Sequence, residues 1–473
     1  MFQPALLKDE HVEPLADGVL AVLEKVGILC QNEELLAALA RAGATVDFAA
    51  QRVRFPRPMV NEYVDQIRQE HGPAEATPRR EEFHAPPLPS METQIAQHFY
   101  DHAQRQKRSG NTRDFITCIK LGDVLHGEQG VGHALLSTDV PPLLEPLNAA
   151  LLLTEYAQKP RRVYPWNFRQ IDYLIEMADL LETPDLWVWG ALCFAHPLRL
   201  DKDVVDRLVR MAKQGVSVGI VAMPVAGVST PVTVEGFIAV AAAEVVAVWI
   251  AARALNPQCL LGGSMWAGTV DMKTGGVSYS AFDSMYYAFA VCEFLRRWTG
   301  VFFPPGTGEY CDAKAPGMYA VLEKHYKAMS VAAFTGRHPG VGQGMLECGK
   351  VLAPVQMMIE RDFAAALGQY AHEISTTPEN LALPTIFEVD LGLHTNFLQS
   401  THTLEHFREA LWLPGLVDRS GWTGPQQDEA LLDRAQLKVE RALDQYRKPE
   451  GREDKLAQMR AIMERAGKKL ASA

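Results

Sequence analysis

The chain has 473 residues, of which 48% are hydrophobic and 22% are charged, an ordinary balance for a soluble globular protein. Its formal net charge of −11 argues against nucleic acid or an anionic membrane as the main partner. The seven cysteines are scattered without a CxxC pair, which favours free thiols and argues against a structural zinc site. The first residues lack the basic start and apolar core of a signal peptide, so we expect a cytoplasmic protein.

The first 75 residues have the spacing of helices. Apolar residues recur at helical intervals in VLAVLEKVGI and in ELLAALARAGA. The proline-rich, charged run ATPRREEFHAPPLPS that follows, at 76–90, can form neither a regular helix nor a central strand. We therefore predict a helical N-terminal region over residues 1–75 and a linker over 76–91.

Short apolar or β-branched runs then recur along the chain. They lie at 96–101, 132–137, 162–166, 186–194, 216–223, 259–266, 300–306 and 331–340. Longer segments with helical spacing separate most of them. Near-continuous apolar strands that alternate with helices indicate a parallel sheet covered on its outside. The sequence predicts an α/β fold, a (β/α)8 TIM barrel over residues 92–372.

One segment, GFIAVAAAEVVAVWIAARAL at 236–255, is long and apolar enough to suggest a membrane span. It carries Glu244 in its middle and Arg253 near its end. A charge at the centre of a bilayer costs roughly 3 kcal/mol or more. We therefore predict a buried helix of a soluble protein, with no membrane partner.

Residues 373–473 are predicted to be a helical C-terminal region. An apolar stripe at spacings of three and four runs through it, formed by Leu432, Ala435, Val439, Ala442 and Tyr446. The stripe fits a helix that packs on its own barrel. The alternative is a contact between subunits of a homo-oligomer.

The reactive groups of a (β/α)8 barrel lie at the carboxyl ends of its strands. The residues predicted there to bind substrate are Asp101, Tyr164, Trp166, Trp266, Phe303 and Tyr310, and those predicted to be catalytic are Glu309 and His338. Several aromatic faces beside a carboxylate suit an alkylated ammonium group, at about 0.5–2 kcal/mol for each cation–π contact. The alternative for each aromatic residue alone is packing.

The run HPGVGQGM at 338–345 raises the question of a phosphate loop. Its GxGxG pattern lacks the GxGxxG spacing and the acidic partner of a nucleotide site, so we predict a tight turn at a strand end. His338 fits a functional and a structural role equally well. His196 is interpreted as a structural cap. His402 and His406 have the i, i+4 spacing of a metal pair but lack an HExxH glutamate and a third ligand, so a structural role is favoured.

Several segments resemble the trimethylamine methyltransferase (MttB-like) family. They are MPVAGVSTPVTVEGFIAVAAAEVVA at 223–247, GGSMWAGTVDMKTGG at 262–276 and CDAKAPGMYAVLEK at 311–324, with shorter matches at 137–142, 379–383 and 402–419. The similarity spans most of residues 1–420. The sequence departs from the family pattern at GTGEYCDAK, which contains Glu309 and Tyr310, and around His338.

The resemblance implies a methyltransferase that moves a methyl group from a quaternary or tertiary methylamine, such as glycine betaine, to the cobalt of a corrinoid protein. The cobalamin belongs to that partner, and no tightly bound metal or nucleotide is expected. Because the sequence shows no in-frame pyrrolysine, it resembles the branch that acts on glycine betaine and related quaternary amines. We predict that Asp101, Trp166, Trp266, Tyr310 and His338 meet in one pocket.

Two other functions stay open at this point. One is a barrel lyase or aldolase that uses Lys314 or a histidine. The other is a non-catalytic protein that binds quaternary amines.

Overall fold

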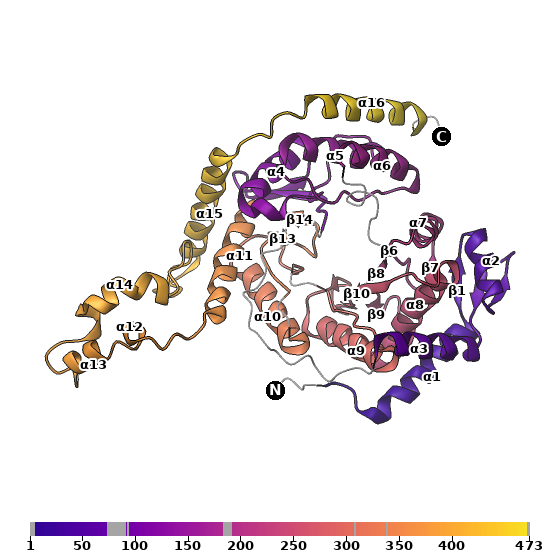
Figure 1. Cartoon of the computed structure of the whole chain (residues 1–473), viewed down its shortest axis with the longest axis horizontal. Coiled ribbons are helices and arrows are strands. Elements are labelled where there is room, and N and C mark those ends of the chain that lie inside the picture. Colours follow the sequence, from indigo (N-terminus) through magenta and orange to yellow (C-terminus); the bar gives the residue numbers. More distant parts are fainter. Residues whose placement is uncertain are drawn as a thin grey trace.

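The computed structural model describes residues 5–72, 91, 94–182, 192–306, 309–336 and 339–470. The predicted linker except Met91, the expected strand at 186–194 up to residue 191, and the predicted catalytic residue His338 lie outside these ranges. Figure 1 shows a ring of helices around short strands, with the N-terminal helices on one side and an extended C-terminal segment on the other.

Short strands occupy the inside of the ring. In chain order they are β4 (His98–Asp101), β5 (Gln106–Ser109), β6 (Leu192–Cys193), β7 (Arg199–Leu200), β8 (Val218–Ala222), β9 (Val225–Ala226), β10 (Leu261–Met265), β11 (Gly268–Val270), β12 (Val277–Ser278), β13 (Met345–Leu346) and β14 (Val351–Leu352). Parallel pairs join β14 to β4, β6 to β8 and β8 to β10. Isolated parallel bridges extend this order, from Ala96 to Leu135, from Val131 to Pro160 and from Met265 to Pro305.

Helices alternate with these strands. They are α4 (Thr112–His126), α5 (Glu145–Tyr156), α6 (Ile171–Leu180), α7 (Lys202–Lys213), α8 (Val234–Leu255), α9 (Phe282–Thr299), α10 (Met318–Thr335) and α11 (Pro354–Leu367), with 3₁₀ turns η1 (Gly127–Gln129), η2 (Phe168–Gln170) and η3 (Gly368–Ala371). Parallel strand pairs that are separated along the chain by helices make this an α/β architecture. Within the described ranges the strands form four separate sheets, and no closed barrel is present.

The runs predicted as strands at 132–137, 162–166 and 300–306 contain no regular strand, only isolated bridges at Leu135 and Pro305. The eighth predicted strand, at 331–340, was wrong. Residues 331–335 are the last turn of α10, which ends where Gly336 takes a left-handed conformation at φ +74°. The apolar run belongs to the buried stripe of that helix, together with Ala320, Val321 and Ala328. The strand that pairs in parallel with β4 is β14, which follows the glycine-rich run.

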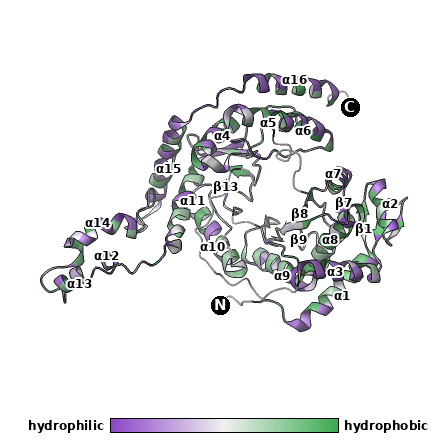
Figure 2. Cartoon of the chain, in the orientation of Figure 1, coloured by the Kyte–Doolittle hydropathy of each residue, from purple (hydrophilic) through white to green (hydrophobic). Residues whose placement is uncertain are grey.

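Helix α8 is the segment that suggested a membrane span. It is the one helix in the described part of the chain that is long and apolar enough to cross a bilayer, and 72% of its most apolar window is buried inside the protein. It packs against α1, α7, α9 and β8. Figure 2 shows α8 as largely hydrophobic within the ring. The prediction of a buried helix is confirmed.

The N-terminal region contains α1 (Asp9–Lys25), α2 (Glu33–Arg41) and α3 (Arg57–His71), as the helical spacing predicted. Asn32 caps α2 by accepting a hydrogen bond from the backbone N–H of Leu35 at 2.8 Å. Three short strands that the sequence did not indicate, β1 (Ile28–Cys30), β2 (Thr45–Asp47) and β3 (Arg52–Arg54), form a sheet with β7. The region is therefore joined to the body through β1 and β7.

The hydrophobic core has two large parts. The first joins α1–α3 to β6, β8, β10, α8 and α9. The second joins α4, α5 and α6 to β13, β14, α11 and the last two helices of the chain. Each end of the chain thus covers a different half of the ring.

The C-terminal region contains α12 (Pro378–Leu381), α13 (Leu383–Val389), η4 (Phe397–Gln399), α14 (Thr401–Ala410), α15 (Pro425–Gln445) and α16 (Glu453–Leu470). Helix α15 packs on α4 and α11, and α16 packs on α5 and α6. The predicted stripe is buried on α15 from Leu432 to Ala442, and Tyr446 donates a hydrogen bond to the Tyr156 carbonyl at 2.8 Å. The stripe packs on the chain's own body.

Candidate functional site

The glycine-rich run surrounds buried carboxylates. Two backbone N–H groups of the run donate to Glu309 Oε1 at 2.7 and 3.1 Å, and the N–H of Gly344 donates to Glu360 Oε2 at 2.9 Å. Lys324 Nζ lies between the two acids, 3.3 Å from Glu309 and 2.6 Å from Glu360. The run therefore binds side chains of its own protein at the position where a nucleotide loop would bind phosphate.

This network is fully enclosed. Glu309 is 2% exposed, and Lys324 and Glu360 are 0% exposed. Burial raises the pKa of Glu360 to about 7, although Lys324 lowers it. Burial by itself lowers the pKa of Lys324, but the two carboxylates outweigh it and raise the pKa on balance. Both carboxylate oxygens of Glu309, a predicted catalytic residue, are thus engaged in a buried ion network.

Two predicted substrate-binding residues, Trp266 and Tyr310, lie together at the end of β10. Their ring centroids are 4.5 Å apart, and Tyr279 meets Tyr310 edge to face at 6.1 Å. The pair is tightly placed, because a Cβ atom at Gly306 would lie 2.5 Å from the Trp266 ring. Tyr310 also donates a hydrogen bond to Gln94 Oε1 at 2.8 Å. The pair is a rigid aromatic surface at a strand end.

A buried cation faces this surface. Lys327 Nζ, on α10, lies 5.7 Å from the centroid of Trp266 and 5.6 Å from that of Tyr310. It donates a hydrogen bond to the Tyr279 carbonyl at 2.8 Å, and the residue is only 4% exposed. Burial lowers the pKa of Lys327 to about 8, while the nearby Cys348 and Asp312 oppose that shift. An ammonium group thus lies where the sequence predicted a cage for the substrate's cation.

A small pocket adjoins Lys327 and Trp266, between the end of β10 and helices α9 and α10. Its other lining residues include Met265, Ala267, Tyr279, Met285, Phe289, Pro305 and Val331. The lining is mostly apolar, with the lysine as its charged member. The lining thus offers apolar contacts and one ammonium group.

Asp312 forms a second polar centre near Lys327. The thiol of Cys348 donates to Asp312 Oδ1 at 3.1 Å, and the hydroxyl of Ser278 donates to Oδ2. Burial and the neighbouring Asp312 together raise the pKa of Cys348 to about 12, so the thiol stays protonated at neutral pH. Asp312 therefore acts here as an acceptor that fixes the loop at Cys348.

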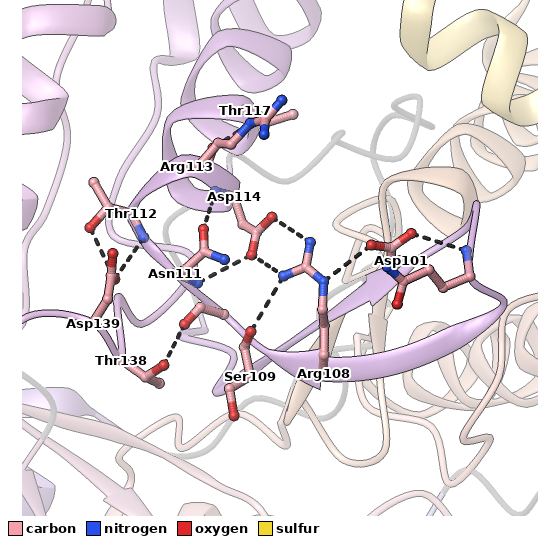
Figure 3. A network of polar contacts seen from close by, with 12 residues as sticks. Asp101, Arg108, Ser109, Asn111, Thr112, Arg113, Asp114, Thr117, Thr138 and Asp139 are labelled. Carbon is pink, nitrogen blue, oxygen red and sulfur yellow. Dashed lines mark hydrogen bonds and ion pairs between the residues drawn. The ribbon is translucent and has the colours of Figure 1, made fainter.

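Asp101 ends β4 and belongs to a separate network that joins β4, β5 and α4 (Figure 3). Arg108 Nε donates to Asp101 Oδ2 at 3.1 Å, and the two terminal nitrogens of Arg108 donate to the two oxygens of Asp114. Burial raises the pKa of Asp101, but the N–H of Gln104 and Arg108 lower it on balance. The contacts of Asp101 anchor the β4–β5 hairpin to the start of α4.

Trp166 takes part in a third network. Its indole N–H donates to Glu145 Oε2 at 3.0 Å, and His133 Nε2 lies 3.0 Å from Oε1 of the same carboxylate. His133 is 0% exposed, whereas Trp166 is 42% exposed. Glu145 also accepts the backbone N–H of Ser137 at 3.1 Å. One face of Trp166 stays open to solvent while its N–H is fixed.

His196 is paired on both sides of its ring. Nδ1 lies 2.8 Å from Glu244 Oε2, and Nε2 accepts the backbone N–H of Met223 at 3.0 Å. Glu244, the charge in the middle of α8, also accepts the N–H of Leu198 at 2.7 Å. The interpretation of His196 as a structural cap is confirmed.

The remaining predicted residues lie apart from the aromatic pair or outside the described ranges. Phe303 is 1% exposed and packs edge to face on Trp249 at 5.9 Å, inside the hydrophobic core. Tyr164 is partly buried just before Trp166. His338 belongs to the residues that the structure does not describe. Among the residues predicted to share one pocket, Trp266 and Tyr310 lie together. Asp101 and Trp166 instead have hydrogen-bond partners of their own.

Comparison with known proteins identifies the family of this chain. The trimethylamine methyltransferase (MTTB) family matches residues 2–471. The chain belongs to this family. Trimethylamine methyltransferase MttB2 of Methanosarcina mazei is 27% identical over 58% of this chain and 55% of its own length, so the chain spans about half the length of such curated relatives. MttB of Desulfitobacterium hafniense is 22% identical over 89% of this chain and 85% of its own length, and the glycine betaine methyltransferase of the same species is 24% identical over 58% and 57%.

A solved structure also matches this MTTB-family chain. The monomethylamine methyltransferase (MtmB) of Methanosarcina barkeri is 12% identical, and the match covers 91% of this chain and 92% of that one with a TM-score of 0.41. Among the described residues, no group of three or more histidine, cysteine or acidic residues is placed to hold a metal ion.

Two residues of this MTTB-family site were missed by sequence reasoning, Lys327 and Asp312. Lys327 had a detectable signal, because its helical spacing places it on the buried face of α10 with Ala320, Lys324 and Val331. A lysine at such a position is buried and must find partners. Asp312 had no signal of its own, since its acceptor role depends on loops that only the fold brings together.

Proposed function

We propose that this chain is a methyltransferase that moves a methyl group from a quaternary or tertiary methylamine to the cobalt of a corrinoid protein. The observation that carries the proposal is the aromatic surface of Trp266 and Tyr310, with Lys327 beside it and a small, mostly apolar pocket lined by Trp266 and Lys327. Membership of the trimethylamine methyltransferase (MTTB) family supports the reaction class.

The barrel is part of the proposal. The parallel pairs and bridges run in chain order from β14 to β4, through residues 131–135 and 160, and again from β6 through β8 and β10 to Pro305. We infer that these are arcs of one (β/α)8 barrel over residues 92–372, between helical regions at 1–75 and 373–473. The aromatic pair then lies at the carboxyl ends of the strands, where barrel enzymes bind their substrates. A cytoplasmic location fits the same class.

Lys327 indicates which methylamines are preferred. Two unit charges 4 Å apart repel each other by about 4 kcal/mol at an effective dielectric constant of 20. A substrate that is only a cation, such as a tetraalkylammonium ion, is therefore disfavoured beside the Lys327 ammonium. A betaine carries a carboxylate that can pair with Lys327 and methyl groups that Trp266 and Tyr310 can cover. We therefore propose a carboxylated quaternary amine, such as glycine betaine, as the substrate.

The chain's own task is mainly to position the substrate. A quaternary ammonium already holds a good leaving group, because its nitrogen departs as a neutral amine with the electron pair of the broken C–N bond. The partner's corrinoid supplies cobalt(I), which gives both electrons of the new bond to the methyl carbon. Lys327 orients the carboxylate, and the aromatic surface holds the methyl groups and excludes water. His338 stays a predicted catalytic residue, for example as a proton donor to a tertiary amine.

The test is an assay of purified protein with free cob(I)alamin and a panel of methylated amines, in which methylcobalamin is followed by its absorbance. We expect product with glycine betaine or a related carboxylated amine, and much less with tetramethylammonium. No product across the panel would reject the transferase. Substrate binding without product would favour the non-catalytic binding protein.

The lyase or aldolase function now has a better candidate residue. Lys314 is exposed, whereas Lys327 is buried with its pKa lowered to about 8, a property of lysines that form Schiff bases. Borohydride treatment in the presence of small carbonyl compounds distinguishes the two functions. A covalent adduct on Lys327 would support the lyase, and its absence together with methylcobalamin formation would support methyl transfer.

A further inference from the structure

Residues 372–413, here named the arm, lie outside both hydrophobic cores. The arm contains α12, α13, η4 and α14, and Val389 is its one buried residue. In Figure 1 it extends away from the ring beyond α11, and Figure 2 shows hydrophobic and hydrophilic residues mixed along it. Its exposed large apolar residues are Ile374, Leu381, Leu383, Ile386, Phe387, Leu391, Leu393, Phe397, Leu398, Leu404, Leu411 and Leu413.

The arm is too weak to hold its shape alone. Leu391 is 80% exposed, Leu398 is 84% exposed and Phe387 is 73% exposed, so the apolar side chains bury little surface within the arm. Its helices have four, seven and ten residues. Isolated helices shorter than about 12–15 residues are marginal in water. The arm therefore needs a surface that covers it whenever the chain is folded.

The same chain has an uncovered apolar stripe on the outer side of α10. Tyr319 is 69% exposed, Leu322 is 61% exposed and Met329 is 51% exposed, and their spacing of three and seven places them on one side of the helix. Phe282 of α9 extends the stripe, since it is 69% exposed and stacks on Tyr326 at 4.5 Å. We name these residues the α10 stripe.

The area of the arm matches that of a stable interface. Complete burial of a large apolar side chain corresponds to roughly 60–120 Å², from about 1.5–3 kcal/mol at 25 cal/mol per Å². Twelve such side chains, exposed by about two-thirds on average, then offer roughly 500–1,000 Å². A standard interface buries about 800 Å² on each partner. Apolar patches of this size on a monomer mark interaction sites.

We propose that two copies of this chain form a two-fold dimer in which the arm of each copy covers the α10 stripe of the other. A second copy is present at equal concentration whenever the chain folds. A corrinoid protein that comes and goes during turnover would leave the arm uncovered between encounters. Exchange of one arm for one stripe in both directions also closes the assembly at two copies, as a two-fold symmetric interface does.

The first test measures the mass of the full-length protein by size-exclusion chromatography with light scattering. The arm variant is Leu391→Asp with Leu398→Asp, and the stripe variant is Leu322→Asp with Met329→Asp. All four side chains are at least half exposed, so these changes leave each folded protomer intact, which circular dichroism verifies. We expect a dimeric wild type and two monomeric variants.

A matched control separates this interface from general loss of surface hydrophobicity. Val228 and Leu260 are 66% and 67% exposed and lie outside both the arm and α10, so Val228→Asp with Leu260→Asp should stay dimeric. A monomeric wild type would overturn the proposal. So would a wild type that becomes an assembly only when a corrinoid protein is added.

Mixing the two variants tests the arm-on-stripe arrangement itself. A heterodimer of arm variant and stripe variant keeps one contact in which both sides are native, whereas neither homodimer keeps any. We therefore expect the mixture to form dimers at concentrations where each variant alone is a monomer. If the mixture stays monomeric, or if the stripe variant remains dimeric on its own, the arm does not bind the stripe and the proposal fails.

Discussion

The sharpest prediction concerns Lys327 and substrate choice. Replacing it by methionine keeps an unbranched side chain, shorter by one atom, in the pocket and removes the charge that lies over Trp266 and Tyr310. A hydrogen bond to a charged group contributes about 1.5–3 kcal/mol. We therefore expect the KM for a carboxylated quaternary amine to rise roughly 10- to 150-fold in K327M, while the KM for tetramethylammonium falls because the repulsion is gone.

The assay is methylcobalamin formation from both amines with free cob(I)alamin, with kcat and KM measured separately. Lys202, whose side chain is 72% exposed, provides the control variant K202M, for which both KM values should equal those of the wild type. The reasoning is refuted if the preference for the carboxylated amine over tetramethylammonium is the same in K327M and the wild type. A loss of kcat alone, with that preference unchanged, would assign Lys327 a different role.

Three further predictions concern stability and can be measured by urea unfolding. The pKa of Lys327 is lowered to about 8 in the folded protein, so the unfolded chain binds more protons between about pH 8 and 10.5. As the pH rises through this range, the free energy of unfolding of the wild type should increase by up to roughly 3 kcal/mol relative to that of K327M. Parallel curves of unfolding free energy against pH for the two proteins would contradict this. Lys324→Met leaves two buried carboxylates unpaired and should cost about 3–5 kcal/mol, and a cost below 1 kcal/mol would contradict the buried network. Gly344→Ala should destabilise more than Gly275→Ala, because both glycines have positive φ but only a Cβ at Gly344 meets a backbone atom, the Ala353 oxygen at 2.5 Å; equal costs would contradict it.

The sequence predicted the parts of the fold that depend on local periodicity. The helical N-terminal region, the buried α8 and the stripe on α15 each follow from apolar spacing within one segment. The strand expected at 331–340 was not found, and the runs at 132–137, 162–166 and 300–306 form at most isolated bridges. A short apolar run does not distinguish a strand from the last turn of a buried helix, and here the preceding residues already set a helical period.

The site was less predictable, because its chemistry depends on which loops the fold brings together. Trp266 and Tyr310 were expected at the strand ends, and they meet there. Glu309 was expected to face substrate. Its position in the sequence gave no sign of Lys324 and Glu360, which lie 15 and 51 residues away along the chain. Lys324 contacts Glu309 and also donates to Glu360. An ionisable residue next to a strand end can therefore be catalytic or structural, and only its contacts in the fold distinguish the two roles.

Helix α10 links the proposed dimer to the proposed active site. Its inner side carries Lys324 in the buried ion network and Lys327 beside the aromatic surface, and its outer side carries the uncovered stripe that includes Leu322. In the described protomer this helix has apolar surface exposed to water on the side opposite its two functional lysines. An arm bound to the stripe would hold α10 from outside and so limit the motion of Lys327 relative to Trp266. In the proposed reaction this chain mainly positions the substrate, so dimer formation and substrate orientation would depend on the same helix.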